Sequence, residues 1–221
     1  MLVALKVNDK RKYEQMTKEI ALTFDDGPWG LTTPRVLDEL IAQKIPATFM
    51  IWGEHAKQYP ELVKRAAAAK LFSFGNHTFS HRSLLEIDEK EIRKELEKTD
   101  HIIRELTGDF PKFIRPPFGD IDFDILKIVN RPVICWSLDT ESWHHHDANQ
   151  CLERATKAED GDILLMHDYQ EAEAEALPKV IDYLQKNDFV FKTIPDLLGH
   201  QLKEESYIYY SRDKRDKIGF K

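Results

Sequence analysis

The sequence predicts an α/β fold of the closed-barrel type, built as a single domain. Short apolar runs alternate with segments of helical periodicity along most of the chain, which is the pattern of repeated βα units with parallel strands. About seven such units fall in one continuous stretch, and this number favours a closed barrel over an open sheet. A chain of 221 residues, of which 42% are hydrophobic, is large enough to bury one substantial core.

The elements of the first half follow from local patterns. The apolar run 20–24 stops at Asp-Asp-Gly-Pro, which ends a strand. Pro34 opens a helix, because proline is favoured at the first helical position. The clearest helix covers 88–107, where Asp88 and Glu91 match a capping box and the charged face is expected to be solvated. The other expected elements are a strand over 47–52 buried on both faces, a helix over 60–69 and a strand over 71–75.

The second half continues the alternation with shorter elements. The expected strands cover 112–115, 133–137, 163–166 and 189–191, and the expected helices cover 122–129, 149–158, 173–186 and 194–199. We therefore divide the chain into an N-terminal extension (1–19), a barrel domain (20–200) and a polar C-terminal tail with a small aromatic cluster (201–221). The tail could pack on the barrel, join a partner chain or be partly disordered, and the sequence leaves these alternatives open.

Composition and charge exclude several classes of protein. The net charge of −7 argues against a nucleic-acid partner, because phosphate binding needs a basic face. No apolar run reaches the length of a membrane span. The start of the chain lacks the layout of a signal peptide, so we expect a cytoplasmic protein if the chain is complete as written, and a secreted or cell-envelope protein if a leader was removed. Cys135 and Cys151 could pair, but two buried free thiols are expected. The oligomeric state stays open.

Polar side chains collect at the ends of the expected strands. In a βα barrel the reacting groups lie where strands end and loops begin. Ordinary surface residues would be scattered over the helix faces as well, so this recurrence predicts an active site at one end of the barrel. The residues at such ends are Asp25, Asp26, His77, His81, Arg115, Asp139, Ser142, Trp143, His167 and Asp168.

The stretch His-Thr-Phe-Ser-His over 77–81 is a candidate metal site. Two histidines four residues apart on a helical turn share one face and can bind one ion. Catalytic zinc sites use three protein ligands and leave a position for water, and the nearest carboxylates are Asp25 and Asp26. Neighbours on an extended stretch point to different sides, so one aspartate can bind the metal while the other acts as a base. Taken alone, each motif is more often a surface feature or a plain turn.

Three further features allow two interpretations each. His167 could be a structural histidine or a general acid that protonates a leaving group. Arg115 could form a surface ion pair, or it could be buried against the carboxylates and keep one of them ionised. The run Trp-His-His-His-Asp over 143–147 suggests a second metal site, but three consecutive histidines cannot all face one ion without a special loop. A rim loop is the simpler interpretation.

Six motifs in order resemble the polysaccharide deacetylases with a NodB-homology domain, carbohydrate esterase family 4. The motifs are TFDDGP, ATFMIWG, GNHTFSH, RPPFG, WSLDTESW and ILLMHD, and they span about 20–198. Each is weak alone, but their order and their places at strand ends make the resemblance specific. It implies a deformed (β/α)7 barrel over the domain 20–200, with one divalent metal ion. Zinc is the expected ion, and cobalt, nickel or iron also suit two histidines and one aspartate.

The resemblance also implies the catalytic roles. Asp25 is similar to the base that activates the attacking water, and His167 is similar to the acid that protonates the leaving amine. The metal ligands implied are Asp26, His77 and His81.

Supporting roles follow from the same resemblance. Arg115 looks like the residue that orients the base, Leu165 like part of the pocket for the acetyl methyl group, and Trp143 like a wall of the cleft. Phe118 stands where the family commonly has tyrosine. Its ring still supplies a wall, and the backbone N–H there could donate to the oxyanion.

One position departs from the family pattern. The family usually has an aspartate directly before the tryptophan of WSLDTESW, where it partners the acid histidine, and this chain has Ser142. Serine carries no negative charge, so His167 is expected to have a lower pKa than is usual in the family. Asp139 could compensate for the missing carboxylate.

The activity implied is hydrolytic removal of N-acetyl groups from an N-acetylated amino-sugar polymer or oligomer of the chitin or peptidoglycan type, with release of acetate. An acetylxylan O-deacetylase or a small-amide hydrolase on the same scaffold is the alternative. An ester needs less help from a general acid than an amide, so Ser142 makes the ester substrate more plausible. A glycan-binding module without turnover is a third reading. Asp25, Arg115 and His167 argue against it, since binding alone needs no base and acid.

Overall fold

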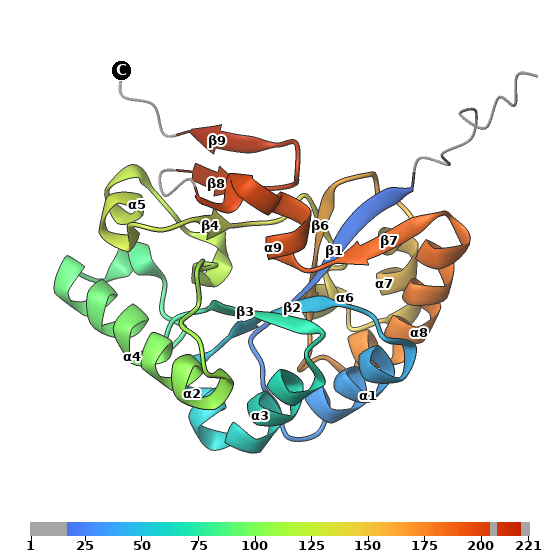
Figure 1. Cartoon of the computed structure of the whole chain (residues 1–221), viewed down its shortest axis with the longest axis horizontal. Helices are drawn as coiled ribbons and strands as arrows, with labels where there is room; N and C mark the ends of the chain where they lie inside the picture. Colours follow the sequence, from blue (N-terminus) through green and yellow to red (C-terminus); the bar gives the residue numbers. More distant parts are fainter. Residues whose placement is uncertain (1–16, 204–206, 218–221) are drawn as a thin grey trace, which may run out of the picture.

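Figure 1 shows a computed structural model of the chain, in which the strands lie at the centre and the helices surround them. The structure describes residues 17–203 and 207–217. Residues 1–16 of the predicted N-terminal extension (1–19) therefore lie outside the described residues. The predicted α/β fold, a single domain of parallel strands covered by helices, is confirmed. No helix in the described ranges combines the length and the apolar character needed to cross a membrane.

The barrel is organised around β1 (Lys18–Asp25). β1 pairs in parallel with β6 (Asp162–His167) along one edge. Its other edge is shared by two strands, because β7 (Phe189–Lys192) pairs with the first half of β1 and β2 (Ala47–Ile51) pairs with the end of it. Two strands on one edge cannot form a regular cylinder, and this is where the barrel is deformed.

The rest of the barrel has short strands. β3 (Phe72–Asn76) pairs with β2, and β5 (Leu138–Asp139) pairs with β6. The predicted strands over 112–115 and 133–137 are too long: the first is reduced to bridges at Ile114, and the second to β4 (Val133–Ile134). Prolines at 111, 116, 117 and 132 flank both segments, and proline has no N–H to donate to a ladder.

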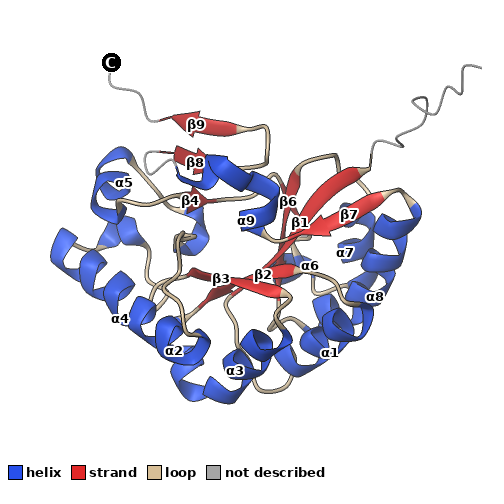
Figure 2. Cartoon of the chain, in the orientation of Figure 1, coloured by secondary structure: helices blue, strands red, loops and turns tan. Residues whose placement is uncertain are grey.

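Helices cover the outside of the strands, as the colouring by secondary structure in Figure 2 shows. Most begin and end within a few residues of the predicted positions, whereas α2, α6 and β5 are short elements that the sequence pattern did not predict. The helices are α1 (Thr33–Gln43), α2 (Gly53–Gln58), α3 (Pro60–Ala69), α4 (Glu89–Thr107), α5 (Phe123–Val129), α6 (Ser142–His145), α7 (Ala148–Ala155), α8 (Glu171–Lys186) and α9 (Ile194–Leu198), with 3-10 turns at Leu84–Glu86, Pro117–Gly119 and Gly199–Lys203.

A C-terminal hairpin lies against β4. Its first strand, β8 (Tyr207–Tyr209), pairs in parallel with β4, and β9 (Arg215–Lys217) pairs with β8 in antiparallel fashion. The Cys135 N–H, just after β4, donates to the Tyr209 carbonyl at 2.8 Å, and Tyr209 is fully buried. The hairpin therefore fixes the segment of chain that follows β4.

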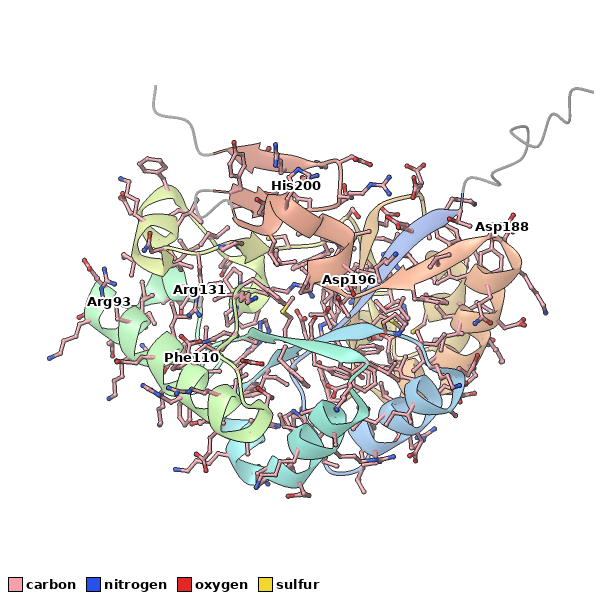
Figure 3. All side chains as sticks on the ribbon, viewed as in Figure 1. Arg93, Phe110, Arg131, Asp188, Asp196 and His200 are labelled. Atoms are coloured by element: carbon pink, nitrogen blue, oxygen red, sulfur yellow. The ribbon has the colours of Figure 1, made fainter. Side chains whose placement is uncertain are left out.

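Alternation along β1 separates the core from the site. Ile20, Leu22 and Phe24 belong to the main apolar cluster, which packs the strands against α1, α3 and α8. Because successive strand residues point to opposite faces, Thr23 and Asp25 point into the barrel instead. Side chains fill the space between strands and helices (Figure 3). The two cysteines are buried and free, as predicted.

The N-cap of α4 offers a stability test. Asp88 Oδ1 accepts a hydrogen bond from the Glu91 N–H at 2.8 Å, as the capping-box pattern predicts. Replacing Asp88 by alanine leaves this N–H without its partner and should lower the free energy of unfolding by about 1 kcal/mol in urea titrations. Asp88→Ser, which keeps a capping oxygen, should lose much less. Equal losses for the two variants would contradict the capping role.

Candidate active site

The strand register brings the predicted base and acid together. Asp25 at the end of β1 is the register partner of His167 at the end of β6, and two residues earlier Thr23 is paired with Leu165. Asp139 of β5 is paired with Leu165 from the other side. Side chains of paired residues stand on the same face of a parallel sheet. Both titratable groups, Asp25 and His167, therefore lie at the end of one face.

Arg115 is fully buried beside Asp25. One nitrogen, Nη1, donates to Asp25 Oδ1 at 2.7 Å and to Thr23 Oγ1 at 2.9 Å. The other two, Nε and Nη2, donate to the backbone carbonyls of Ile134 and Cys135, both at 2.9 Å. The alternative of a surface ion pair is therefore wrong. The guanidinium is held at several points and fixes one oxygen of a carboxylate that is only 3% exposed.

Asp26, His77 and His81 form a compact cluster, the one group of three or more potential metal ligands within the described ranges. Asp26 Oδ1 lies 3.1 Å from His77 Nε2 and 2.9 Å from His81 Nε2, and one ligand atom from each residue falls within 4.8 Å of the others. His77 Nδ1 lies 2.7 Å from the Arg115 carbonyl oxygen, which can only accept. His77 therefore carries a proton on Nδ1, and its Nε2 faces Asp26.

The two histidines converge through a loop, and the prediction of a helical turn over 77–81 was wrong. Thr78 and His81 have φ values of 64° and 56°, in the left-handed region that side chains other than glycine rarely adopt. The Thr78 carbonyl accepts from the Gly53 N–H at 2.9 Å, and Glu95 Oε2 of α4 accepts from the N–H groups of Phe79 and Ser80 at 3.0 and 2.7 Å. These outside partners replace the hydrogen bonds of a helical turn.

A partly buried polar network connects α4 to the same loop. Asn76 Oδ1 accepts from the Thr78 N–H at 2.8 Å, while Asn76 Nδ2 donates to Asp100 Oδ1 at 2.6 Å. Asp100 also forms a two-point ion pair with Arg131, labelled in Figure 3, at 3.0 and 2.9 Å. Sequence reasoning assigned the charged face of α4 to solvent, and it missed the support that Asp100 and Glu95 give to the histidine loop.

Asp26 also has a left-handed backbone, with φ of 69°. The predicted extended stretch therefore ends at Asp25, and the two carboxylates diverge through this turn. Burial alone would raise the pKa of Asp26, but hydrogen bonds and charge from His77 and His81 outweigh burial and hold it well below the usual range. Burial likewise acts to lower the pKa of His77, and Asp25 and Asp26 raise it. Carboxylate and imidazole thus stabilise each other's charged forms.

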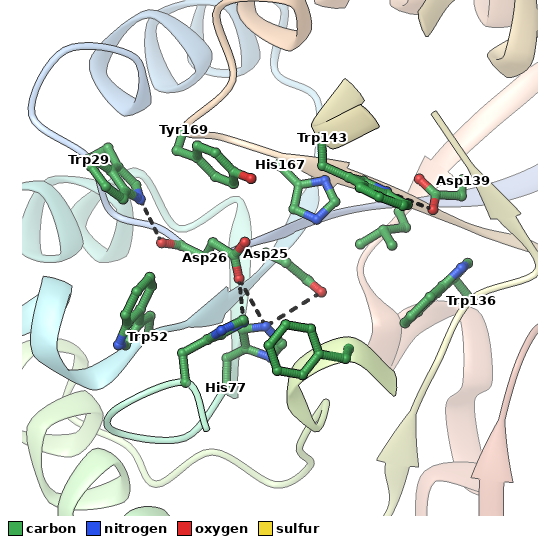
Figure 4. A pocket seen from close by; sticks show the side chains of 13 residues that line it. Asp25, Asp26, Trp29, Trp52, His77, Trp136, Asp139, Trp143, His167 and Tyr169 are labelled. Carbon is green, nitrogen blue, oxygen red and sulfur yellow. Dashed lines mark hydrogen bonds and ion pairs between the residues drawn. The ribbon is translucent and has the colours of Figure 1, made fainter. Parts of the chain in front are cut away.

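The cavity above these groups has a volume of about 520 Å³, in the range of small-molecule sites. Phe118, Trp143 and Leu165, which the resemblance places at the substrate, are among the residues that line it. Figure 4 shows that aromatic rings surround the carboxylates. The rings that the sequence reading did not assign to the site are Trp29, Trp52, Trp136 and Tyr169. Trp52 and Tyr169 follow strand ends. A search of strand ends for aromatic residues, as well as for polar ones, would therefore have found them.

The remaining predicted residues lie around His167. Asp139 lines the cavity, but its Oδ1 accepts from the Glu141 N–H at 2.7 Å and its Oδ2 from Trp143 Nε1 at 3.3 Å. Ser142 is fully buried and is not one of the residues that line the cavity. Burial lowers the pKa of His167, against the charges of Asp25 and Asp139. His167 lines the cavity while its Nδ1 is buried, so Nε2 is the nitrogen that reaches the cavity.

Two of the three histidines over 143–147 form hydrogen bonds within the protein. His145 Nε2 lies 2.7 Å from the Thr140 carbonyl oxygen, and His146 Nδ1 lies 3.1 Å from Gln170 Oε1. His144 is exposed. The segment forms part of the rim, and its histidines do not gather into a metal cluster within the described ranges.

Asp168 is a second buried acid next to the site. It is fully buried, Oδ2 accepts from Thr33 Oγ1 at 2.7 Å, and burial raises its pKa to about 7. A Cβ added to Gly27 would lie 2.2 Å from Asp168 Oδ2. Glycine is therefore needed at this point of TFDDGP, because the turn passes directly over the Asp168 carboxyl group.

The comparison with protein families matches residues 12–132 to "Polysaccharide deacetylase". The chain belongs to this family. A peptidoglycan-N-acetylglucosamine deacetylase of Listeria monocytogenes is 35% identical over 199 residues, which is 90% of this chain and 42% of the Listeria protein. The chain thus spans about two fifths of the length of that relative.

Solved structures agree with the family assignment. The structure of T48 deacetylase with substrate has a TM-score of 0.83 and 35% identity, and the match covers 87% of this chain and 96% of that one. A family 4 acetyl xylan esterase from Clostridium thermocellum, solved in complex with a cobalt ion, has a TM-score of 0.82 and 29% identity over 89% of this chain and all of the esterase chain. The predicted (β/α)7 deacetylase fold is confirmed by these likenesses.

The His-Asp cluster predicts the outcome of a metal-content measurement. His77→Ala/His81→Ala removes two of the three clustered ligand atoms, so zinc bound after dialysis should fall from about one ion per chain to near zero by elemental analysis. His144→Ala, in the exposed rim, should bind as much zinc as the wild type. Full zinc content in the double variant would place the metal elsewhere, and the rim histidines would be tested next.

Proposed function

We propose that this polysaccharide deacetylase family member is a metal-dependent hydrolase that removes N-acetyl groups from an N-acetylated amino-sugar polymer or oligomer of the chitin or peptidoglycan type and releases acetate. The observation that carries the proposal is the pairing of a buried, arginine-held Asp25 with His167 across the β1–β6 register, beside the cluster of Asp26, His77 and His81. Deacetylases on N-acetylated glycans among the relatives support the substrate class.

The donor set fits a divalent metal ion. The ligand atoms of Asp26, His77 and His81 converge, and the Arg115 carbonyl fixes the His77 tautomer that turns Nε2 toward the cluster. Two imidazoles and a carboxylate suit zinc first, and cobalt, nickel or iron as well. When bound, the ion supplies a Lewis acid that polarises the acetyl carbonyl and lowers the pKa of water.

The chain's own residues divide the proton transfers. Asp25 takes a proton from the water whose oxygen forms the new C–O bond, and Arg115 keeps the Asp25 carboxylate oriented toward that water. The backbone N–H of Phe118 donates to the oxyanion. His167 Nε2 then delivers its proton to the nitrogen as the C–N bond breaks. The products are acetate and a free amino sugar, whose nitrogen carries the proton from His167.

Aromatic rings around the cavity suit a sugar substrate. Trp143 is about half exposed and Phe118 is 65% exposed, so both rings are accessible from solvent at the site. Leu165 is buried between Thr23 and Asp139 and offers an apolar contact of the size of an acetyl methyl group. The aromatic faces bind the apolar faces of sugar rings, while Leu165 takes the acetyl group.

An acetate-release panel tests the proposed function. Chelated enzyme supplied with zinc should release acetate from N-acetylglucosamine oligomers or peptidoglycan fragments faster than from acetylxylan, and chelated enzyme without added metal should be inactive. Asp25→Asn should lose at least about 100-fold in kcat, which assigns the activity to this site. Faster release from acetylxylan would favour the ester alternative, and oligosaccharide binding without acetate release would favour a binding module.

The exposed tryptophan predicts a split between binding and turnover. Trp143→Ala removes a stacking surface that is present before and during the reaction, so KM for a chitooligosaccharide should rise about tenfold while kcat changes little. Trp143→Phe keeps a ring face and should recover most of the loss. A large fall in kcat with unchanged KM would show that Trp143 acts on the reaction itself.

A further inference from the structure

Three buried polar atoms lack hydrogen-bond partners in one small region beside the cavity. They are Ser142 Oγ, His167 Nδ1 and Glu173 Oε1. The three residues are neighbours: Glu173 Oε2 accepts from the His167 backbone N–H at 3.4 Å, and Ser142 Oγ approaches the Glu173 carboxyl group without a hydrogen bond of ordinary geometry. Unpaired buried polar groups are costly, so such a cluster calls for an explanation.

Glu173 is an unusual residue for its place in the fold. It lies in the first turn of α8, yet it is fully buried, and Thr140 Oγ1 donates to its Oε2 at 2.7 Å. No lysine or arginine forms an ion pair with Glu173 within the described part of the chain. A buried carboxyl group without a cationic partner is destabilising, and a basic residue, His167, contacts Glu173 through its backbone N–H.

We infer that Glu173 is a positioning residue for His167, and that it supplies from α8 the carboxyl group that Ser142 does not supply from α6. The free oxygen of Glu173, directly or through the Ser142 hydroxyl, accepts from His167 Nδ1–H. This keeps Nε2 turned toward the cavity and stabilises the imidazolium that protonates the leaving amine. The inference rests on the proposed function, because it gives His167 the role of general acid.

The carboxyl groups that line the cavity together with His167 already have partners. Asp25 is held by Arg115, Asp26 by His77 and His81, and both oxygens of Asp139 accept hydrogen bonds. Asp139, which the sequence offered as a substitute for the missing aspartate, is therefore less available than Glu173.

Several titratable groups face the pair. His167 faces Asp25, Asp26 and Asp139, with His77 as the opposing positive group and the Tyr169 ring edge at 5.7 Å. Glu173 faces Asp139 and Cys151. Burial raises the pKa of Glu173 to about 7, against the hydroxyl groups of Thr140 and Ser142. A carboxyl group with such a pKa can share a proton with an imidazole near neutral pH.

The experiment compares two substrates that differ in their need for a general acid. The amine of an N-acetylglucosamine oligomer must be protonated to leave, whereas 4-nitrophenolate leaves from 4-nitrophenyl acetate without a proton. Glu173→Gln keeps the size of the side chain and removes its charge. We expect it to lower kcat on the oligomer at least tenfold with little change in KM, and to alter 4-nitrophenyl acetate hydrolysis less than twofold.

Relocating the carboxyl group is the specific rescue. Ser142→Asp/Glu173→Gln places a carboxylate at the other position, and it should recover most of the turnover on the oligomer. Glu175→Gln, an exposed residue of the same helix, is the matched control for the charge change and should behave as the wild type. Equal loss on both substrates, no loss on either, or a double variant no better than Glu173→Gln would each overturn the inference.

Two further results, a variant that does not fold and a wild-type enzyme inactive on N-acetylated sugars, also have defined consequences. If Glu173→Gln does not fold, Ser142→Asp alone provides the test. An unchanged kcat on the oligomer would show that His167 already has its carboxyl partner, and a tenfold higher kcat would overturn the inference. If wild-type enzyme cleaves 4-nitrophenyl acetate but no N-acetylated sugar, the proposed function fails, and the role of Glu173 in protonating an amine fails with it. Failure of the Glu173 inference alone appears only in the variants.

Discussion

The buried ion pair between Arg115 and Asp25 is the constraint on which the site depends. A carboxylate that is 3% exposed needs a fixed cation, and Arg115 provides one that is anchored to Thr23, Ile134 and Cys135. Removing one partner of such a pair typically costs about 3–5 kcal/mol, because the other charge is left buried. The C-terminal hairpin adds to this arrangement, since Tyr209 binds the backbone of Cys135, whose carbonyl holds the guanidinium.

Strained backbone positions collect at the same site. Asp26, Thr78, His81 and Phe118 all have left-handed φ values, and each lies in a segment that follows a strand or bridge. Such positions cost energy and persist only where surrounding contacts determine them. Here the contacts come from α4 and from the paired strand ends. The strain turns Asp26 and His81 toward one another, which an unstrained helical turn or strand would not do.

Much of this arrangement could be predicted from the sequence. Apolar runs and helical periods located most of the elements, because those patterns reflect burial directly. The recurrence of polar residues at strand ends identified Asp25, His77, Arg115 and His167, because parallel strands bring their carboxyl ends to one edge of the sheet. The resemblance then assigned roles to these residues.

The rest depends on contacts between distant segments. The strand segments at Ile114 and β4 are shorter than their apolar runs suggest. The flanking prolines have no N–H to donate to a strand ladder, and the backbone after β4 hydrogen-bonds to the C-terminal hairpin. Glu95 and Glu173 look like helix-surface glutamates in the sequence, yet one holds the histidine loop and the other is buried behind His167. No local pattern distinguishes them from solvated glutamates, because their burial is set by tertiary packing.

We propose that the adjacent carboxylates have different roles, Asp25 in proton transfer and Asp26 in metal binding. Zinc affinity by isothermal titration, measured on Asp25→Asn and Asp26→Asn, tests it most directly. We expect Asp25→Asn to bind zinc with wild-type stoichiometry and an affinity within about tenfold of wild type, and Asp26→Asn to lose at least about 100-fold in zinc affinity. Equal losses in the two variants, or the larger loss in Asp25→Asn, would contradict the division of roles.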